Sequence, residues 1–275
     1  MIKGNECYSL KGATYGVYSD PECKTQAAVL TTKEDGTTDA EELPAGKYYI
    51  KELTAPKGYA LDSKKYTAEV TAGSTASVNA KDYPQSAAVS ILLEKADPQT
   101  DKKESQGNAS FAGAEYSTDP SGKGISPART WVVKTDKTGK AYLTDGLKVS
   151  GDDFYRNSDG KNVLPLGTVT IQETKAPKGY LLNQATFIRQ ITSKGTAENV
   201  STYNAPVISE DIICGELHLI KFGQDEDDSR EKKTPLEGVT FEIISKTTGE
   251  TVKITTDKNG YASTEQLDNG LVYDS

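Results

Sequence analysis

Two ionisable side chains stand where predicted strands are otherwise apolar. Lys95 ends the alternating apolar pattern of residues 91–95, and Glu173 ends a similar pattern over residues 169–173. Because successive side chains of a strand point to opposite faces, both residues are predicted to face inward. Burial would lower the lysine pKa and free a neutral amine nucleophile, and it would raise the glutamate pKa and keep a proton available. An ordinary buried ion pair is the alternative.

The elements that would position these residues are repeated along the chain. Residues 43–62 read LPAGKYYIKELTAPKGYALD, and residues 164–183 read LPLGTVTIQETKAPKGYLLN. Their offset is 121 residues, which is too long for a solenoid unit and indicates that a whole domain is duplicated. A Gly-x-x-Tyr/Phe motif precedes both blocks at Gly12 and Gly113, and it occurs again at Gly238. A third copy is therefore predicted.

These landmarks predict three domains. Domain 1 covers residues 1–85, with part of its first strand missing, and domain 2 covers residues 86–207. Domain 3 covers residues 214–275 and is cut off before its second half. An insertion at about 140–163 is predicted to be a surface loop of domain 2. Short β-rich segments separated by Gly-containing turns indicate an all-β fold of tandem, immunoglobulin-like antiparallel sandwiches.

Composition argues against several function classes. The chain has 40 acidic and 32 basic residues, a net charge of -8, which does not suit a nucleic-acid partner. It has one histidine, His218, and its three cysteines form no CxxC motif. We therefore expect that the protein binds no metal and no cofactor, and that it is not an enzyme with turnover. The acidic run at 225–228 suggests a solvated turn, with calcium as the alternative. No apolar run is long enough to span a membrane.

The repeated motifs resemble a known family. The residues Gly-Ala/Val-x-Tyr/Phe, followed by Leu-Pro-x-Gly-x-x-x-Ile-x-Glu-x-x-Ala-Pro-Lys-Gly-Tyr, look like the CnaB-type domain, also called SpaA-like or prealbumin-like. The resemblance covers nearly the whole chain, as two copies and part of a third. Such domains form stalks and pilins of wall-anchored adhesins in Gram-positive bacteria. The resemblance therefore implies a structural role at the cell wall or cell surface.

The resemblance also implies a covalent cross-link. Many members join a first-strand lysine to a last-strand Asn or Asp through an isopeptide bond, with a glutamate as proton shuttle. In domain 2 these positions match Lys95, Asn204 and Glu173. Lys95 would attack the side-chain carbon of Asn204, and ammonia would leave. The reaction occurs once per molecule, so it is maturation and not turnover.

Domain 1 matches this pattern less completely. Glu52 corresponds to Glu173, and Asp82 is matched to the acceptor position because a proline follows it closely. Lys3 is the candidate nucleophile, but it lies nine residues before Gly12, whereas the domain 2 lysine lies 18 residues before its matching glycine. The alternative is a lysine upstream of residue 1.

Two further candidate sites lie outside this pattern. Lys221 matches the first-strand lysine in domain 3, where no matching Glu or Asn follows. Cys7 and Cys23 flank the predicted strand at 12–18 and could form a disulfide, with two free thiols as the alternative.

Two functions remain after these exclusions. The first is a stalk or pilin-like segment stiffened by isopeptide bonds, whose partners are the neighbouring domains of the same surface protein. The second is an adhesin module that binds a host extracellular-matrix protein or glycan, for which the insertion at 140–163 is the candidate contact.

Overall fold

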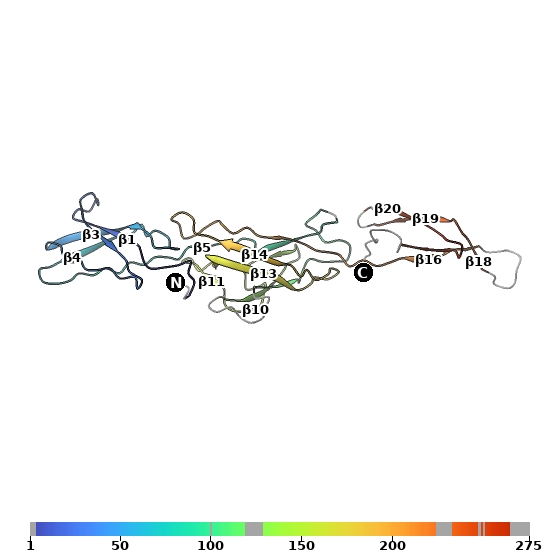
Figure 1. The fold of residues 1–275 in the computed structure, drawn as a ribbon, viewed down its shortest axis with the longest axis horizontal. Coiled ribbons are helices and arrows are strands. Elements are labelled where there is room, and N and C mark those ends of the chain that lie inside the picture. Colours follow the sequence, from blue (N-terminus) through green and yellow to red (C-terminus); the bar gives the residue numbers. More distant parts are fainter. Residues whose placement is uncertain are drawn as a thin grey trace.

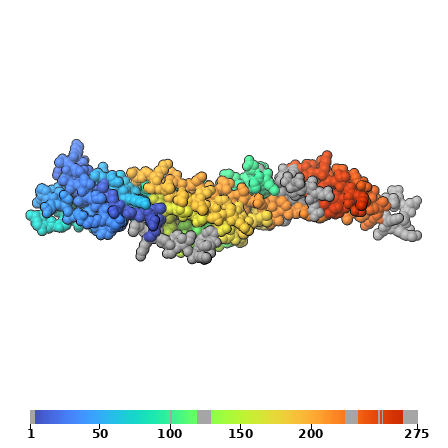
Figure 2. Space-filling view, viewed as in Figure 1, coloured from blue at the N-terminus to red at the C-terminus, as the bar shows by residue number. Residues whose placement is uncertain are grey.

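The computed structural model describes residues 4–99, 101–118, 129–223, 233–246, 249 and 251–264. The chain forms three modules in file along an elongated molecule, with β1–β4 at one end and β16–β21 at the other (Figure 1). The space-filling view shows the same rod-like outline (Figure 2). The described residues form strands and turns without an α-helix, which confirms the all-β prediction. It follows that none of the described residues belongs to a helix able to cross a membrane.

Domain 1 contains one four-stranded antiparallel sheet. Its strand order is β2-β1-β3-β4, from β2 (Gln26–Thr31), β1 (Thr14–Tyr18), β3 (Gly46–Thr54) and β4 (Lys65–Val70). In β3 the buried side chains alternate with more exposed ones, as expected for a sheet with one covered face. The buried face holds a small core of Ala13, Tyr15, Val17, Tyr48 and Ile50.

Domain 2 has a corresponding sheet and a second layer. The main sheet runs β10-β8-β7-β13-β14, from β10 (Lys148–Gly151), β8 (Trp131–Lys134), β7 (Glu115–Ser117), β13 (Gly167–Lys175) and β14 (Thr186–Ile191). One three-stranded sheet of the second layer runs β15-β6-β9, from β15 (Val207–Ser209), β6 (Leu93–Ala96) and β9 (Lys140–Ala141). The other runs β11-β12-β5, from β11 (Tyr155–Arg156), β12 (Asn162–Pro165) and β5 (Ser86–Ala87). Both layers contribute to one core, so domain 2 is a sandwich.

The insertion at 140–163 is not the surface loop that its sequence predicts. It contains β9, β10 and β11 and enters β12. Phe154 and Val163 are buried, and Phe154 packs against Trp131 with ring centroids 5.6 Å apart. Polar turn residues at 151–160 obscure these apolar positions in the sequence. The segment extends the domain 2 core.

Domain 2 continues beyond residue 207, where its end is predicted. Residue 207 opens strand β15, which pairs in parallel with β6. Five residues further on, Ile212 bridges to Tyr180 and packs with Phe111 in a small core cluster. The prediction used Pro206 as a strand stop, whereas strand pairing and packing with domain 2 continue through β15 and Ile212.

Domains 1 and 2 meet at a hydrogen-bonded joint around Tyr8 and Gln85. The Tyr8 hydroxyl donates to the carbonyl oxygen of Gln85 at 2.6 Å and accepts the amide proton of Leu166 at 2.7 Å. The amide nitrogen of the buried Gln85 side chain donates to the carbonyl oxygens of Lys194, Gly195 and Ala197. Tyr8 and Tyr59 also join the core cluster of domain 2. Satisfied buried polar groups of this kind hold two modules in one orientation.

The described part of domain 3 consists of three two-stranded antiparallel sheets. They pair β16 (His218–Ile220) with β21 (Tyr261–Ser263), β17 (Phe222–Gly223) with β18 (Thr234–Pro235), and β19 (Thr240–Ile244) with β20 (Thr251–Thr255). The amide of Lys221 donates to the carbonyl oxygen of Gly260. The amide of Lys95 donates in the same way to Gly139, so the two lysines occupy equivalent positions.

Candidate cross-linking site

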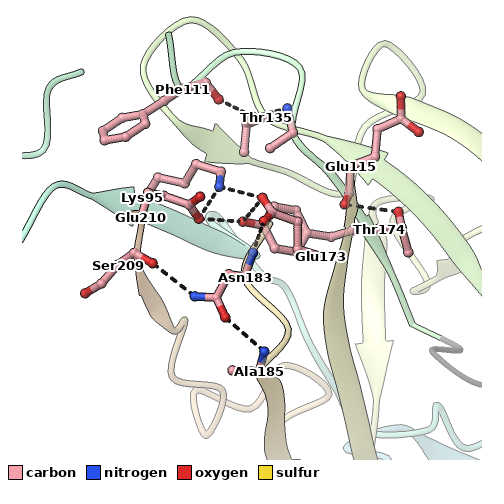
Figure 3. Close-up of polar contacts among 12 residues, drawn as sticks. Lys95, Phe111, Glu115, Thr135, Glu173, Thr174, Asn183, Ala185, Ser209 and Glu210 are labelled. Atoms are coloured by element: carbon pink, nitrogen blue, oxygen red, sulfur yellow. Dashed lines mark hydrogen bonds and ion pairs between the residues drawn. The ribbon is translucent and has the colours of Figure 1, made fainter. Parts of the chain in front are cut away.

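Lys95 is a completely buried lysine in the core of domain 2. Strand β6 carries it between the two other strands of its sheet, and none of its surface is exposed. Its Nζ lies 2.8 Å from Glu173 Oε1, and it forms a second ion pair with Glu210 Oε1 (Figure 3). The ring of Tyr116 lies 5.1 Å from Nζ. The sequence prediction that Lys95 and Glu173 meet inside the sandwich is therefore confirmed.

Both side-chain oxygens of Glu173 accept hydrogen bonds. Its Oε1 accepts from Lys95 and from the Tyr116 hydroxyl, at 2.8 and 3.1 Å. Its Oε2 accepts the backbone amide proton of Asn183 at 2.8 Å (Figure 3). Asn183 follows the Ala-Pro-Lys-Gly-Tyr turn, so the turn positions a donor against the glutamate on β13. Both carboxylate oxygens of Glu173 are thus fixed.

Glu210 completes the cluster and was not predicted from the sequence. It is 1% exposed and directly follows strand β15. Its Oε1 contacts Lys95 Nζ and lies 3.3 Å from the Tyr116 hydroxyl, while its Oε2 is buried without a hydrogen-bond partner. Burial raises the pKa of Glu210 to about 7, although the charge of Lys95 opposes this shift. Glu210 therefore holds a proton far more readily than an exposed carboxyl does.

The charges of the cluster favour one protonated carboxyl. Two carboxylates beside one ammonium would leave a net negative charge in the core, which is costly. With the proton on Glu210 the cluster is neutral. The same proton count allows a neutral amine beside two carboxylic acids, which is the state that amide formation requires. Burial and the two carboxyl groups also raise the pKa of the Tyr116 hydroxyl, which keeps it a donor.

The structure does not bring Asn204 to Lys95. Asn204 is exposed, and its backbone oxygen accepts from Arg189 Nε. Opposite Lys95 in the parallel ladder stands Ile208, so the last-strand side chain that reaches the amine is Glu210, two residues further on. The last-strand side chain beside the Lys95 amine is therefore that of Glu210 and not that of Asn204. The prediction aligned on Pro206, whereas the structural counterpart of Pro84 is Ile212.

Domain 1 contains counterparts of the two carboxyl groups of this site. Asp62 donates its amide proton to Glu52 Oε2, as Asn183 does to Glu173. Burial raises the pKa of the Tyr15 hydroxyl, and the nearby carboxyl groups of Asp82 and Glu52 raise it further. Burial is the main cause that raises the pKa of Glu52 and the pKa of Asp82. Glu52 thus accepts the same kind of backbone hydrogen bond as Glu173. Because the bridge of Tyr59 to Pro84 corresponds to that of Tyr180 to Ile212, Asp82 occupies the position of Glu210 and not that of Asn204.

These raised pKa values predict that domain 1 becomes less stable as the pH rises. Above the ordinary carboxyl pKa the unfolded chain loses its protons first, so the folded state binds more protons until the pH passes the raised values. Wild type should therefore lose stability, relative to the double variant Glu52→Gln/Asp82→Asn, as the pH rises from about 4, the ordinary carboxyl pKa, through the raised pKa values. Calorimetry of both proteins measures this. Glu69→Gln, at an exposed strand position, is the control, and a wild-type advantage that grows with pH would contradict the prediction.

The other predicted cross-link residues fall into two groups. Lys3 lies outside the described residues, as does the acidic run at 225–228. Lys221 is described and its side chain is exposed. Within the described ranges no group of three His, Cys, Asp or Glu residues could hold a metal ion.

The structure does not pair Cys7 with Cys23. Both are free thiols. Cys7 precedes β1 and packs against the domain 2 core at the joint, whereas Cys23 lies beyond the other end of β1 in the turn that follows Tyr18. A strand of five residues spans about 15 Å, and a disulfide needs Cα atoms within about 7 Å. The predicted disulfide is corrected to two separate thiols.

Comparison with known proteins finds one domain family along the whole chain. A family model described as SpaA, prealbumin-like fold domain, matches residues 2–84, 97–206 and 224–274. Over 63 residues, 23% of this chain, the sequence is 41% identical to the trypsin-resistant surface T6 protein of Streptococcus pyogenes serotype M6. That alignment covers 11% of the T6 protein.

Solved structures resemble the chain as well. The Bacillus anthracis TIE protein matches with a TM-score of 0.55 and 27% identity, over 94% of this chain and 41% of that protein. A C-terminal fragment of the pilus adhesin SpaC from Lactobacillus rhamnosus GG matches with a TM-score of 0.40 and 18% identity, over 77% of this chain and 92% of the fragment. The chain spans less than half the length of the T6 and TIE proteins.

Proposed function

The chain belongs to the SpaA family of prealbumin-like fold domains, and we propose that it is a stalk segment of a Gram-positive surface protein, stiffened by a covalent bond within domain 2. Its relatives by sequence and structure include a streptococcal surface protein and a pilus adhesin. The elongated arrangement of modules and the bonded joint at Tyr8 suit a load-bearing segment. An extracellular location at the cell wall or cell surface follows from this proposal.

The observation that carries the proposal is the contact of Lys95 Nζ with Glu210 Oε1 inside the core. In the proposed reaction the amine lone pair attacks the Glu210 side-chain carboxyl carbon. The bond from that carbon to Oε2 breaks, and this oxygen leaves as water with protons drawn from the amine and the carboxyl groups. Glu173 accepts and returns a proton. The oxygen that leaves is the one without a hydrogen-bond partner.

The fold supplies what the reaction lacks in water. Amide formation between a free amine and a carboxylic acid is slow because both groups are charged and dilute. Here Lys95 is fully buried and its partners are fixed by Tyr116 and Asn183, so proximity and desolvation replace an external catalyst. One bond forms per molecule, and the domain is not an enzyme with turnover.

The proposed bond predicts a definite mechanical behaviour. A pulling force enters domain 2 near Ser86 and leaves near Ile212, so an amide between residues 95 and 210 diverts the force around the sandwich. The chain between these residues should not extend. In a Glu210→Ala variant the same segment should unfold and release roughly 400 Å of contour length.

Single-molecule force spectroscopy on the full chain measures this difference. Asn204→Ala is the matched control and should behave as wild type. Release of the 95–210 segment from the wild-type protein would contradict the proposal.

The host-binding alternative lacks a comparable observation. Its candidate contact, the insertion at 140–163, forms strands that help to build the core. A host-matrix protein or glycan therefore remains a prediction from family resemblance, and the proposed partners are the neighbouring domains of the same surface protein.

A further inference from the structure

Tyr116 places one hydroxyl between the two carboxyl groups of the domain 2 site. It stands on β7 directly opposite Glu173 in the antiparallel pair with β13, and it is 1% exposed. Its hydroxyl oxygen lies 3.1 Å from Glu173 Oε1 and 3.3 Å from Glu210 Oε1. This Glu210 oxygen is also the one in contact with Lys95 Nζ. The hydroxyl therefore reaches the carboxyl group that the amine attacks in the proposed reaction.

Domain 1 has the same arrangement of a tyrosine and two acids. Tyr116 is the tyrosine of the Gly-Ala-x-Tyr motif, and Tyr15 is its counterpart in domain 1. The Tyr15 hydroxyl is a hydrogen-bond partner of both Glu52 and Asp82. Packing alone would be served by phenylalanine, which domain 3 has at this position of the motif as Phe241. A hydroxyl shared by two acids in both domains points to a role in the chemistry of the acids.

We propose that the Tyr116 hydroxyl is a catalytic group of the cross-linking reaction, in which it stabilises the negative charge that develops on Glu210 Oε1. This inference rests on the proposed function. When the amine attacks, the electron pair of the carbonyl bond moves to the oxygen that remains in the amide. That oxygen is Oε1, because Oε2 leaves as water. A donor aimed at this oxygen inside a buried site acts as an oxyanion hole.

The single proton of this hydroxyl can follow the charge through the reaction. At the start Glu173 is charged and is the nearer acceptor, and Glu210 carries a proton on Oε2. The ammonium group of Lys95 gives one proton to Glu173, and attack by the resulting amine moves the negative charge to Glu210 Oε1. Glu173 returns its proton to Oε2, which leaves as water. Glu173 then takes the second proton of the nitrogen as the carbonyl bond re-forms.

This sequence makes the hydroxyl a better partner of the transition state than of the starting state. Its hydrogen bond to Glu210 Oε1 strengthens only while that oxygen is charged, and interactions of this kind accelerate a reaction. Burial is the main cause that raises the pKa of Tyr116, and the charges of Glu210 and Glu173 raise it further, so the hydroxyl keeps its proton.

The test measures the rate of water loss in the full chain with Tyr116→Phe. The chain is made by cell-free translation, which is then stopped, and samples are denatured in acid at intervals for intact-mass spectrometry. Removal of one oxyanion donor slows other enzymes by about 100 to 1000 fold, and we expect a reduction of this size. Water loss should still reach completion, because Lys95 and Glu210 are retained. Tyr203→Phe is the matched control, since it removes a hydroxyl of domain 2 that donates to the carbonyl oxygen of Leu92, and it should react at the wild-type rate.

A second background, Glu210→Gln, separates this role from others. There ammonia leaves in place of water, but Oε1 still bears the charge, so Tyr116→Phe should slow the loss of ammonia by the same factor. A factor that depends on the leaving group would show that the hydroxyl acts on the departing atom. A fraction of Tyr116→Phe chains that never reacts would show a purely structural role.

Either of these results would overturn the inference, as would maturation of Tyr116→Phe at the wild-type rate. In that last case wild type still loses water, so the cross-link stands and the role of Tyr116 alone falls. A wild-type chain that loses no water would overturn both.

Discussion

Replacing the buried lysine, in Lys95→Met, should remove about 5 kcal/mol from the unfolding free energy of domain 2. A bond between residues 95 and 210 closes a loop of the order of 100 residues, and a link across such a loop stabilises by about 4.7 kcal/mol. The variant also leaves the carboxyl groups of Glu173 and Glu210 buried together, whereas in the cross-linked protein one of them is part of a neutral amide, which adds to the loss. Because whole domains are stable by about 5–15 kcal/mol, the change is a large share of the total.

Urea unfolding followed by the fluorescence of Trp131 measures this effect, since the chain has one tryptophan and it is buried in domain 2. The matched control is Lys175→Met, which removes an exposed lysine paired with Glu115 at 3.1 Å. Exposed pairs contribute at most about 1 kcal/mol, so the control should stay near wild type. Equal effects of the two substitutions would show that Lys95 carries no special bond.

The variant Glu173→Gln should fold but fail to form the bond. Glutamine retains the shape of the side chain and can still accept from the Asn183 amide, but it cannot accept and return a proton. Lys95 and Glu210 would still lie in contact. In other proteins, removing a group that acts as general acid or base slows the reaction by about 100 to 10,000 fold. The intact mass of the purified variant should therefore show no loss of water.

Glu94→Gln provides the control for this experiment. Glu94 precedes Lys95 on β6, and its side chain pairs with Lys103 and Lys140 near the surface. That variant should lose water as wild type does. If Glu173→Gln matured as fully as Glu94→Gln, Glu173 would have no part in proton transfer.

Most of the fold follows from local patterns in the sequence. Alternating apolar residues before Lys95 and Glu173 specify inward faces, and the repeated Ala-Pro-Lys-Gly-Tyr turn fixes the same strand pair in two domains. The segment at 140–163 is different, because its strands are only two to four residues long and their apolar positions gain meaning only through packing on Trp131. Short strands of this kind carry too little periodicity to be recognised.

Only part of the site can be predicted from the sequence, for a related reason. Lys95 and Glu173 interrupt clear apolar patterns, whereas the acceptor depends on the register of the last strand, and prolines at 84 and 206 suggest the wrong register. A signal was available: Ile208 and Glu210 alternate as Ala80 and Asp82 do, which places an acid on the inner face in both domains. The contribution of Tyr116 could not be read from sequence, since it depends on β7 lying beside β13.

The intact mass of the folded chain, followed by peptide mapping, tests the central claim most directly. A bond from Lys95 to Glu210 predicts that the wild-type protein is lighter than its sequence by one water, and that the peptides containing these two residues remain joined. Glu210→Gln should reach the same final mass by losing ammonia, while Asn204→Ala should still lose water. A wild-type mass equal to that of the sequence, or a loss of ammonia that maps to Asn204, would contradict the account.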